Sequence, residues 1–212
     1  MLLSAYRQGI FPWFSEGDPV LWWSPDPRFV IEPGEVHVSR SMARVLRKGT
    51  FQLTLDRDFE EVIERCASTA RPGQPGTWIT RDMQQAYRRL HRLGYAHSCE
   101  AWREGELVGG VYGVALGRIF FGESMFSHVS NASKAALIGL CRFLDRHAYH
   151  LFDAQLYTPH VERMGGHPLD RADFLRRLRR ALGDPTMRGD WSLLPFPEHQ
   201  TERVSTGNHC PQ

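Results

Sequence analysis

Residues 118–127 read RIFFGESMFS, and residues 152–157 read FDAQLY. The first stretch alternates, is rich in aromatic residues and carries a carboxylate, so it predicts a β-strand. Between the two stretches, apolar residues recur at helical spacing: Leu137, Leu140, Cys141, Leu144 and Ala148. A strand, a crossover helix and a second strand in this order predict a parallel or splayed pair of strands. The ends of such strands collect polar groups that act on a ligand.

The second strand carries two polar residues two positions apart, Asp153 and Gln155. Successive side chains of a strand point to opposite faces, so these two share one face, and Phe152, Ala154 and Leu156 share the other. We therefore predict that a carboxylate and a carboxamide look into one space. An ordinary polar strand face is the competing interpretation.

The composition is that of a globular protein, with 42% hydrophobic and 24% charged residues. A chain of 212 residues can form one core or a main domain with a small companion, and we favour the second. A net charge of +2 is too small to indicate nucleic-acid binding by itself. The cysteines are widely spaced, without a metal-type or redox pair. Because export-signal features and long apolar runs are missing, we expect a cytoplasmic protein. Because a spaced cluster of His and Cys is missing too, we expect no metal.

Aromatic residues are unusually dense among the prolines of residues 9–28, as in FPWF at 11–14 and LWWSPDPR at 21–28. Core packing explains several of these rings. Loops fixed by proline also hold flat rings open for stacking on a base. Both interpretations stay open for any single Trp, but as a group the rings suggest a platform for a nucleotide.

The remaining elements are predicted from periodicity and from capping residues. Amphipathic helices are expected over about residues 39–49, 58–67, 80–94 and 170–182, and an antiparallel hairpin over 97–103 and 107–114. The helix over 170–182 has an arginine-rich face, which is either solvated or in contact with phosphate. Residues 70–76 are expected to form a flexible loop, and the tail over 197–212 is expected to be loose.

Six short blocks follow one another along the chain: FPWF (11–14), WWSPDPR (22–28), GTWIT (76–80), GESMFS (122–127), NASK (131–134) and DAQ (153–155). Through these blocks the chain, from residue 1 to about 196, resembles the leucyl/phenylalanyl-tRNA protein transferases. The resemblance implies an α+β fold with a small N-terminal domain (1–30), a mixed-sheet catalytic domain of the acetyltransferase-like GNAT type (31–196) and a C-terminal tail (197–212). Family members carry a further segment ahead of the first helix, so we expect either that the small domain is incomplete or that the start of the sequence is misassigned.

The resemblance also implies the activity. Members move Leu or Phe from charged tRNA to the N-terminal α-amino group of proteins that begin with Arg or Lys, which marks those proteins for degradation. Aminolysis of an aminoacyl ester is already activated and requires neither ATP nor a metal, so we expect no cofactor. The expected partners are aminoacyl-tRNA and a protein or peptide acceptor.

Roles for individual residues follow from the same resemblance. Asp153, Gln155 and Glu123 are the expected catalytic residues. Gln155 accepts a hydrogen bond from the attacking amine, Asp153 orients the amide, and Glu123 either holds a substrate ammonium or helps to carry the proton. Trp13 and Trp78 are expected to stack on the 3′-terminal adenosine of the tRNA.

Phe120, with Val111, Leu140 and Leu144, is expected to line the pocket for the aminoacyl side chain. Some members carry Met or Phe where this chain has the last three residues, which leaves the preference between Leu and Phe open. A hydrophobic pocket distinguishes one methylene by only ~1–3 kcal/mol, so we expect Leu, Phe and Met all to be accepted.

Two other classes of protein compete with this one. An acyl-CoA-dependent N-acetyltransferase shares the expected fold, but residues 127–131 read SHVSN and form a poor cradle for a pyrophosphate. A non-catalytic RNA-binding module would use the aromatic loops and the arginine-rich helix. In that case, Asp153 and Gln155 would be dispensable.

Overall fold

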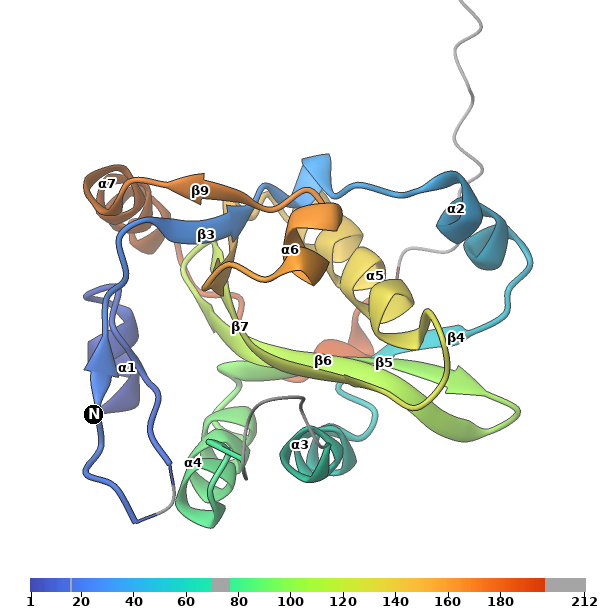
Figure 1. Cartoon of the computed structure of the whole chain (residues 1–212), viewed down its shortest axis with the longest axis horizontal. Coiled ribbons are helices and arrows are strands. Elements are labelled where there is room, and N and C mark those ends of the chain that lie inside the picture. The colour runs from blue at the N-terminus through green and yellow to red at the C-terminus, as the bar shows by residue number, and fades with distance from the viewer. Residues whose placement is uncertain (16, 70–76, 197–212) are drawn as a thin grey trace, which may run out of the picture.

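The computed structural model describes residues 1–15, 17–69 and 77–196. Within these residues, seven strands form a sheet in the order β4-β5-β6-β7-β8-β3-β9 (Figure 1). Their bounds are Gln52–Leu55 (β4), Ala96–Arg103 (β5), Glu106–Leu116 (β6), Ile119–Ser127 (β7), Leu151–Gln155 (β8), Arg28–Ile31 (β3) and His167–Leu169 (β9). β7 and β8 run parallel, and the other neighbouring strands run antiparallel. The α+β class, the mixed sheet and the parallel pair are thereby confirmed.

Helices cover both faces of the sheet (Figure 1). One face is covered by α5 (Ala132–Arg146) and α2 (Arg40–Arg47), and the other by α3 (Phe59–Ser68) and α4 (Arg81–Arg92). The shorter or peripheral helices are α1 (Leu2–Tyr6), α6 (Pro159–Arg163), α7 (Arg171–Leu182), η1 (Pro33–Glu35) and η2 (Trp191–Leu193). Across the described part of the chain, every helix is too short or too polar to cross a membrane.

The helix starts follow the predicted capping chemistry. The side chains of Ser39, Asp58 and Thr80 each accept a hydrogen bond from the backbone N–H three residues further on, at the start of α2, α3 and α4. Gly94 follows α4 with a positive φ of 75°, as expected of a residue that ends a helix. The expected hairpin is the β5–β6 pair. The predictions for residues 70–76 and 197–212 lie outside the described residues.

The N-terminal segment packs on the α3–α4 side of the sheet. After α1, the strands β1 (Phe11–Pro12) and β2 (Trp22–Trp23) pair antiparallel. Tyr6 and Phe11 are buried in the same apolar cluster as Phe121 and Phe174. The short strand β3 then leads the chain into the main sheet. The division into domains stays a prediction.

β7 and β8 stay paired for three residues and then part. Their last pair is Phe121 with Asp153, whereas β7 continues to Ser127. Each strand is also irregular just beyond this pair. The β6–β7 register skips Glu123, and the β3–β8 register skips Ala154. Bulges of this kind bend a strand and turn its side chains away from simple alternation, so a space opens between the two strand ends.

A close contact between β6 and α5 provides a test of this packing. A Cβ added to Gly109 would lie 2.5 Å from the Ala132 Cβ and 2.9 Å from the Ala132 carbonyl carbon. Because overpacking of this kind forces backbone shifts, Gly109→Ala should lower the free energy of unfolding by about 1–3 kcal/mol, measured by urea titration. Gly183→Ala is the control, since its Cβ would meet Arg180 O at 3.2 Å, and its stability should change little. Equal free energies of unfolding for Gly109→Ala and Gly183→Ala would contradict the close contact between Gly109 and Ala132.

Candidate active site

A cavity of about 550 Å³ opens where β7 and β8 part. Most of its wall is apolar or aromatic: Phe11, Pro12, Trp13, Trp78, Val111, Met125, Phe126, Phe152, Ala154, Leu156 and Val161. The polar side chains at the wall are Thr69, Glu123, Ser124, Ser127, Ser133, Gln155, Thr158 and His160. A volume of this size with a mainly apolar wall and some polar side chains is typical of a site for a small organic ligand or for the end of a larger one.

Five of the residues predicted for the site line this cavity: Trp13, Trp78, Val111, Glu123 and Gln155. They come from the N-terminal hairpin, the segment before α4, and the strands β6, β7 and β8. The fold therefore brings both predicted stacking rings and two of the three predicted catalytic residues to one space.

Three residues predicted for the aminoacyl pocket lie elsewhere. Phe120, Leu140 and Leu144 are fully buried in the core on the α5 face. The Phe120 ring packs against Phe152 and Trp191, with centroids 5.7 and 6.0 Å away. Phe152, the strand partner of Phe120, is itself part of the wall, so the Phe120 ring that stacks on it lies one layer further into the core. Leu140 and Leu144 lie in the same core on α5.

Most of the apolar wall is formed by residues that the sequence pattern did not predict for the site. Met125 and Phe126 lie on β7 beyond the parting, and Leu156 and Val161 follow β8. Alternation predicts which side chains share a strand face, but it does not say where two strands separate. The aromatic stretch 118–127 was a signal for this wall, and its second half is the part that faces the cavity.

Glu123 accepts three hydrogen bonds from neutral groups. Tyr6 Oη donates at 2.7 Å, Tyr87 Oη at 2.5 Å and Gln155 Nε2 at 2.9 Å. Burial raises the pKa of Glu123 to about 7, and nearby Asp153 acts in the same direction, while the hydrogen bonds partly offset both. Burial raises the pKa of both tyrosines too, which keeps them protonated as donors. Glu123 therefore changes its charge near neutral pH.

The contact with Glu123 fixes the direction of the Gln155 amide. Gln155 Nε2 donates to Glu123, and an ionised carboxylate can only accept hydrogen bonds, so the NH₂ end of the amide faces Glu123 when Glu123 is charged. Gln155 also lines the cavity, and its oxygen is the end that remains for a ligand. An amide oxygen presented in this way accepts a hydrogen bond from an amine.

The backbone at Gln155 is strained. Its φ is +67°, a region that residues other than glycine rarely adopt. Leu156 N donates to Ala154 O at 2.7 Å, which closes a γ-turn centred on Gln155. Strain of this kind persists where surrounding contacts over-determine the conformation, and it is concentrated at functional sites.

Asp153 lies behind the wall and is fully buried. Arg28 binds it through two hydrogen bonds, from Nε to Oδ1 at 2.8 Å and from Nη2 to Oδ2 at 2.7 Å. The backbone N–H of Gln155 donates to Asp153 Oδ1 at 2.9 Å. Asp153 therefore contacts the main chain of Gln155, whereas the sequence predicted that both side chains look into one space.

Among the described residues, one group has the spacing of metal ligands: Asp56, His91 and His97. The Nδ1 atoms of both histidines and the carboxylate of Asp56 already have hydrogen-bond partners. Asp56 accepts from His97 Nδ1 at 2.7 Å and from the Trp191 backbone N–H at 3.0 Å, and His91 Nδ1 contacts Ala96 O at 2.8 Å. We therefore interpret the group as a structural link between β5 and η2. That the protein works without a metal stays a prediction.

Comparisons with known proteins agree with this site. A sequence profile described as leucyl/phenylalanyl-tRNA protein transferase matches residues 30–179, and the profile for the N-terminal domain of that family matches residues 1–26. These matches define the chain as an enzyme of the aminoacyltransferase class. It belongs to the leucyl/phenylalanyl-tRNA protein transferase family.

Relatives support the assignment over most of the chain. A leucyl/phenylalanyl-tRNA–protein transferase of Syntrophus aciditrophicus (strain SB) is 57% identical over 194 residues, which cover 92% of this chain and 81% of the relative. One from Anaeromyxobacter sp. (strain Fw109-5) is 55% identical over 192 residues, 91% of this chain and 82% of the relative. A solved structure of a functionally unknown conserved protein from Staphylococcus epidermidis is more distant, with a TM-score of 0.45, 15% identity and coverage of 68% of this chain and 57% of its own.

The raised pKa of Glu123 predicts a pH dependence of stability. Glutamate ordinarily titrates near 4.5, so between about 4.5 and 7 the folded state binds more protons than the unfolded state. The contribution of Glu123 is fully present below the ordinary pKa and is lost as the pH rises through about 7. Glu123→Gln should flatten the curve of unfolding free energy against pH by roughly 1–3 kcal/mol, measured by urea titration across this range.

Glu100 provides a matched control. It is fully buried on β5, accepts hydrogen bonds from Ser98 and Thr54, and burial raises its pKa to about 7 as well. Glu100→Gln should flatten the stability curve in the same way, but it should leave the catalytic rate unchanged because Glu100 lies outside the cavity wall. A Glu123→Gln variant with the wild-type pH curve would contradict the assigned protonation change.

Proposed function

We propose that the cavity binds the 3′ end of tRNA charged with Leu or Phe and transfers the amino acid to the N-terminal α-amino group of a protein that begins with Arg or Lys. The observation that carries the proposal is that Trp13, Trp78 and the Gln155 amide line one cavity, with the Gln155 NH₂ group tied to Glu123. Two rings, an amide oxygen and an apolar wall suit an adenosine, an amine and an aminoacyl side chain, respectively.

The reaction is the attack of an amine nitrogen on an ester carbonyl carbon. A C–N bond forms, and the bond between that carbon and the 3′ oxygen of the adenosine breaks. One proton leaves the amine, and one reaches the departing oxygen. Holding the two reactants in line accounts for much of the acceleration, about 7–11 kcal/mol in well-oriented cases. An α-amino group has a pKa of about 7.7–8.0, so part of it is already neutral near pH 7.

Gln155 positions the nucleophile in this scheme. Its amide oxygen accepts a hydrogen bond from the attacking amine, which directs the nitrogen lone pair at the ester. An amide is a very weak base, so we assign Gln155 to positioning and not to full proton removal. We assign that proton to Glu123, because it lines the same cavity and its pKa is raised to about 7.

Glu123 also explains the choice of acceptor in this proposal. Its carboxylate is a negative charge within a mostly apolar cavity, and its hydrogen bonds come from neutral groups. A cationic acceptor end lowers the free energy of that buried charge, whereas a neutral or acidic end does not. N-terminal Arg or Lys is the acceptor that this electrostatic environment favours.

The aminoacyl side chain fits the apolar part of the wall. Met125, Phe126 and Phe152 lie on the two strands that part, beside Val111. Met is flexible and adapts to side chains of different shape. We therefore assign these residues to the aminoacyl pocket and expect Leu, Phe and Met to be accepted.

The finer fold assignment is part of the same proposal. A sheet whose parallel pair parts at the binding site, with a crossover helix between the two strands, is the arrangement expected of an acetyltransferase-like GNAT domain. Cytoplasmic charged tRNA is the donor, and degradation of the modified protein is the expected consequence.

A three-armed assay tests the function. The protein is incubated with Leu-charged tRNA and a peptide that begins with Arg, and separately with acetyl-CoA and the same peptide. Retention of the tRNA is measured in parallel. We expect leucyl transfer to the peptide. Acetyl transfer, or tRNA retention without product, would overturn the proposal in favour of one of the two competing classes.

Gln155→Ala separates catalysis from binding. Because it removes the amide that positions the amine, it should lower kcat by about 100-fold while the affinity for charged tRNA changes little. An equal loss of affinity and kcat would assign Gln155 to binding or folding instead.

Trp13→Ala should have the opposite profile. Loss of one stacking ring costs about 1–3 kcal/mol per base, so KM for charged tRNA should rise by roughly 5-fold to 150-fold with a smaller change in kcat. Trp22→Ala is the control, since Trp22 is an exposed ring of the same hairpin that lies outside the cavity wall. Similar KM values for the two variants would remove Trp13 from the nucleotide site.

A further inference from the structure

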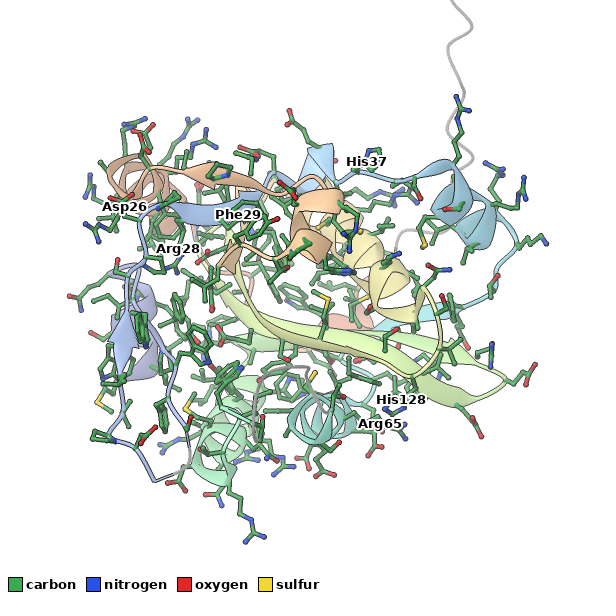
Figure 2. The ribbon with its side chains drawn as sticks, in the orientation of Figure 1. Asp26, Arg28, Phe29, His37, Arg65 and His128 are labelled. Carbon is green, nitrogen blue, oxygen red and sulfur yellow. The ribbon has the colours of Figure 1, made fainter. Side chains whose placement is uncertain are left out.

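Arg28 is a buried cation whose guanidinium group is surrounded by hydrogen-bond acceptors and aromatic rings. It is 1% exposed at the start of β3, where the N-terminal segment and α7 meet the sheet (Figure 2). Its Nε and Nη2 bind the two oxygens of Asp153, and Nη1 donates to Gly9 O at 3.2 Å. The rings of Phe11 and Phe174 each lie 4.6 Å from the guanidinium carbon. A planar fork is required here, because an ammonium cannot make this set of contacts at once.

On one side, Arg28 is linked to the turn at Gln155 by the hydrogen bonds of one residue, Asp153. Asp153 Oδ1 accepts from both Arg28 Nε and the Gln155 backbone N–H. The carboxylate is fully buried and lies outside the cavity wall. Its contacts therefore hold the strained main chain of Gln155 in place, and Asp153 is not positioned to take a proton from a ligand.

On the other side, Arg28 reaches the loop that carries the predicted stacking ring. Gly9, which accepts from Arg28, precedes Phe11, Pro12 and Trp13, and these three residues line the cavity. The Phe11 ring packs on the guanidinium and also forms part of the wall. The Arg28 side chain thus contacts Phe11, which lies in the cavity wall near Trp13, and Asp153, which binds the backbone of Gln155.

We infer that Arg28 is a positioning residue of the transferase. It fixes the position of the turn at Gln155 relative to the loop that carries Trp13. The inference rests on the proposed function, since it specifies how the amide is kept at the right distance from a stacked adenosine. Asp153 acts in the same chain of contacts. Its role is to orient the Gln155 main chain, not to accept the substrate proton.

Arg28→Lys is the direct test. Lysine keeps the charge but cannot bind both Asp153 oxygens and Gly9 O, so the turn should lose its fixed geometry. We expect the single-turnover rate of leucyl transfer at saturating enzyme to fall by roughly 100-fold, and the dissociation constant for charged tRNA to change by less than about threefold. Hydrogen exchange at the Gln155 backbone N–H should become faster.

Arg177→Lys is the matched control. Arg177 also forms an ion pair close to β3, with Nη1 2.7 Å from Glu32 Oε1, but it is 41% exposed. Its replacement should leave both the transfer rate and the exchange of the Gln155 N–H at their wild-type values. A transfer rate of Arg28→Lys within about threefold of wild type would overturn the inference. The inference is likewise overturned if the transfer rate of Arg28→Lys falls only in proportion to the fraction of that variant that is unfolded.

A double variant covers the case in which Arg28→Lys does not fold. Arg28→Gln with Asp153→Asn removes both charges together, so neither charge is left buried without its partner. It should fold and show the same loss of single-turnover rate. A folded double variant with the wild-type rate would overturn the inference.

Failure of the proposed function would be visible separately. If the wild-type protein transfers no Leu, that function is wrong, and the exchange measurement still decides whether Arg28 fixes the turn. Unchanged exchange in Arg28→Lys would then overturn the positioning role as well.

Discussion

The parting of β7 and β8 beyond Phe121 and Asp153 is the constraint on which the site depends. A parallel pair that stayed hydrogen-bonded to its ends would fill this space with main chain. The skipped residues Glu123 and Ala154 disturb the register on both strands where they separate. The resulting cavity has a carboxylate on one strand and an amide on the other, within hydrogen-bond distance of each other.

Holding these groups in a mostly apolar cavity requires support from distant parts of the chain. Glu123 is stabilised by hydroxyl groups of α1 and α4, and Asp153 by the guanidinium at the start of β3. Unsupported polar groups at these positions would be costly to bury. The N-terminal segment therefore contributes to the site twice, through the Tyr6 hydroxyl and through the contacts of Gly9 and Phe11 with Arg28.

Local patterns predicted the elements well and the cavity only partly. Helical spacing and capping residues located α2, α3 and α4, because these features depend on neighbours in the sequence. The alternating pattern over 118–127 correctly predicted a strand. Phe120 was predicted to line the aminoacyl pocket, but it lies in the core. The parting of two strands depends on register across the sheet, which no single strand encodes. The pairing of Arg28 with Asp153 could not be predicted for the same reason, since it joins residues that are 125 positions apart in the sequence.

In the proposed complex, the Gln155 amide oxygen holds the attacking amine next to an adenosine-bound ester in this cavity. A crystal structure with a 3′-aminoacylamido-adenosine, in which an amide replaces the labile ester, measures this directly. We expect an adenine ring against Trp13 and Trp78, the aminoacyl side chain beside Met125 and Phe152, and the Gln155 oxygen on the side of the carbonyl carbon from which an amine would attack. An analogue bound outside the cavity, or a Gln155 oxygen turned toward Glu123, would contradict it.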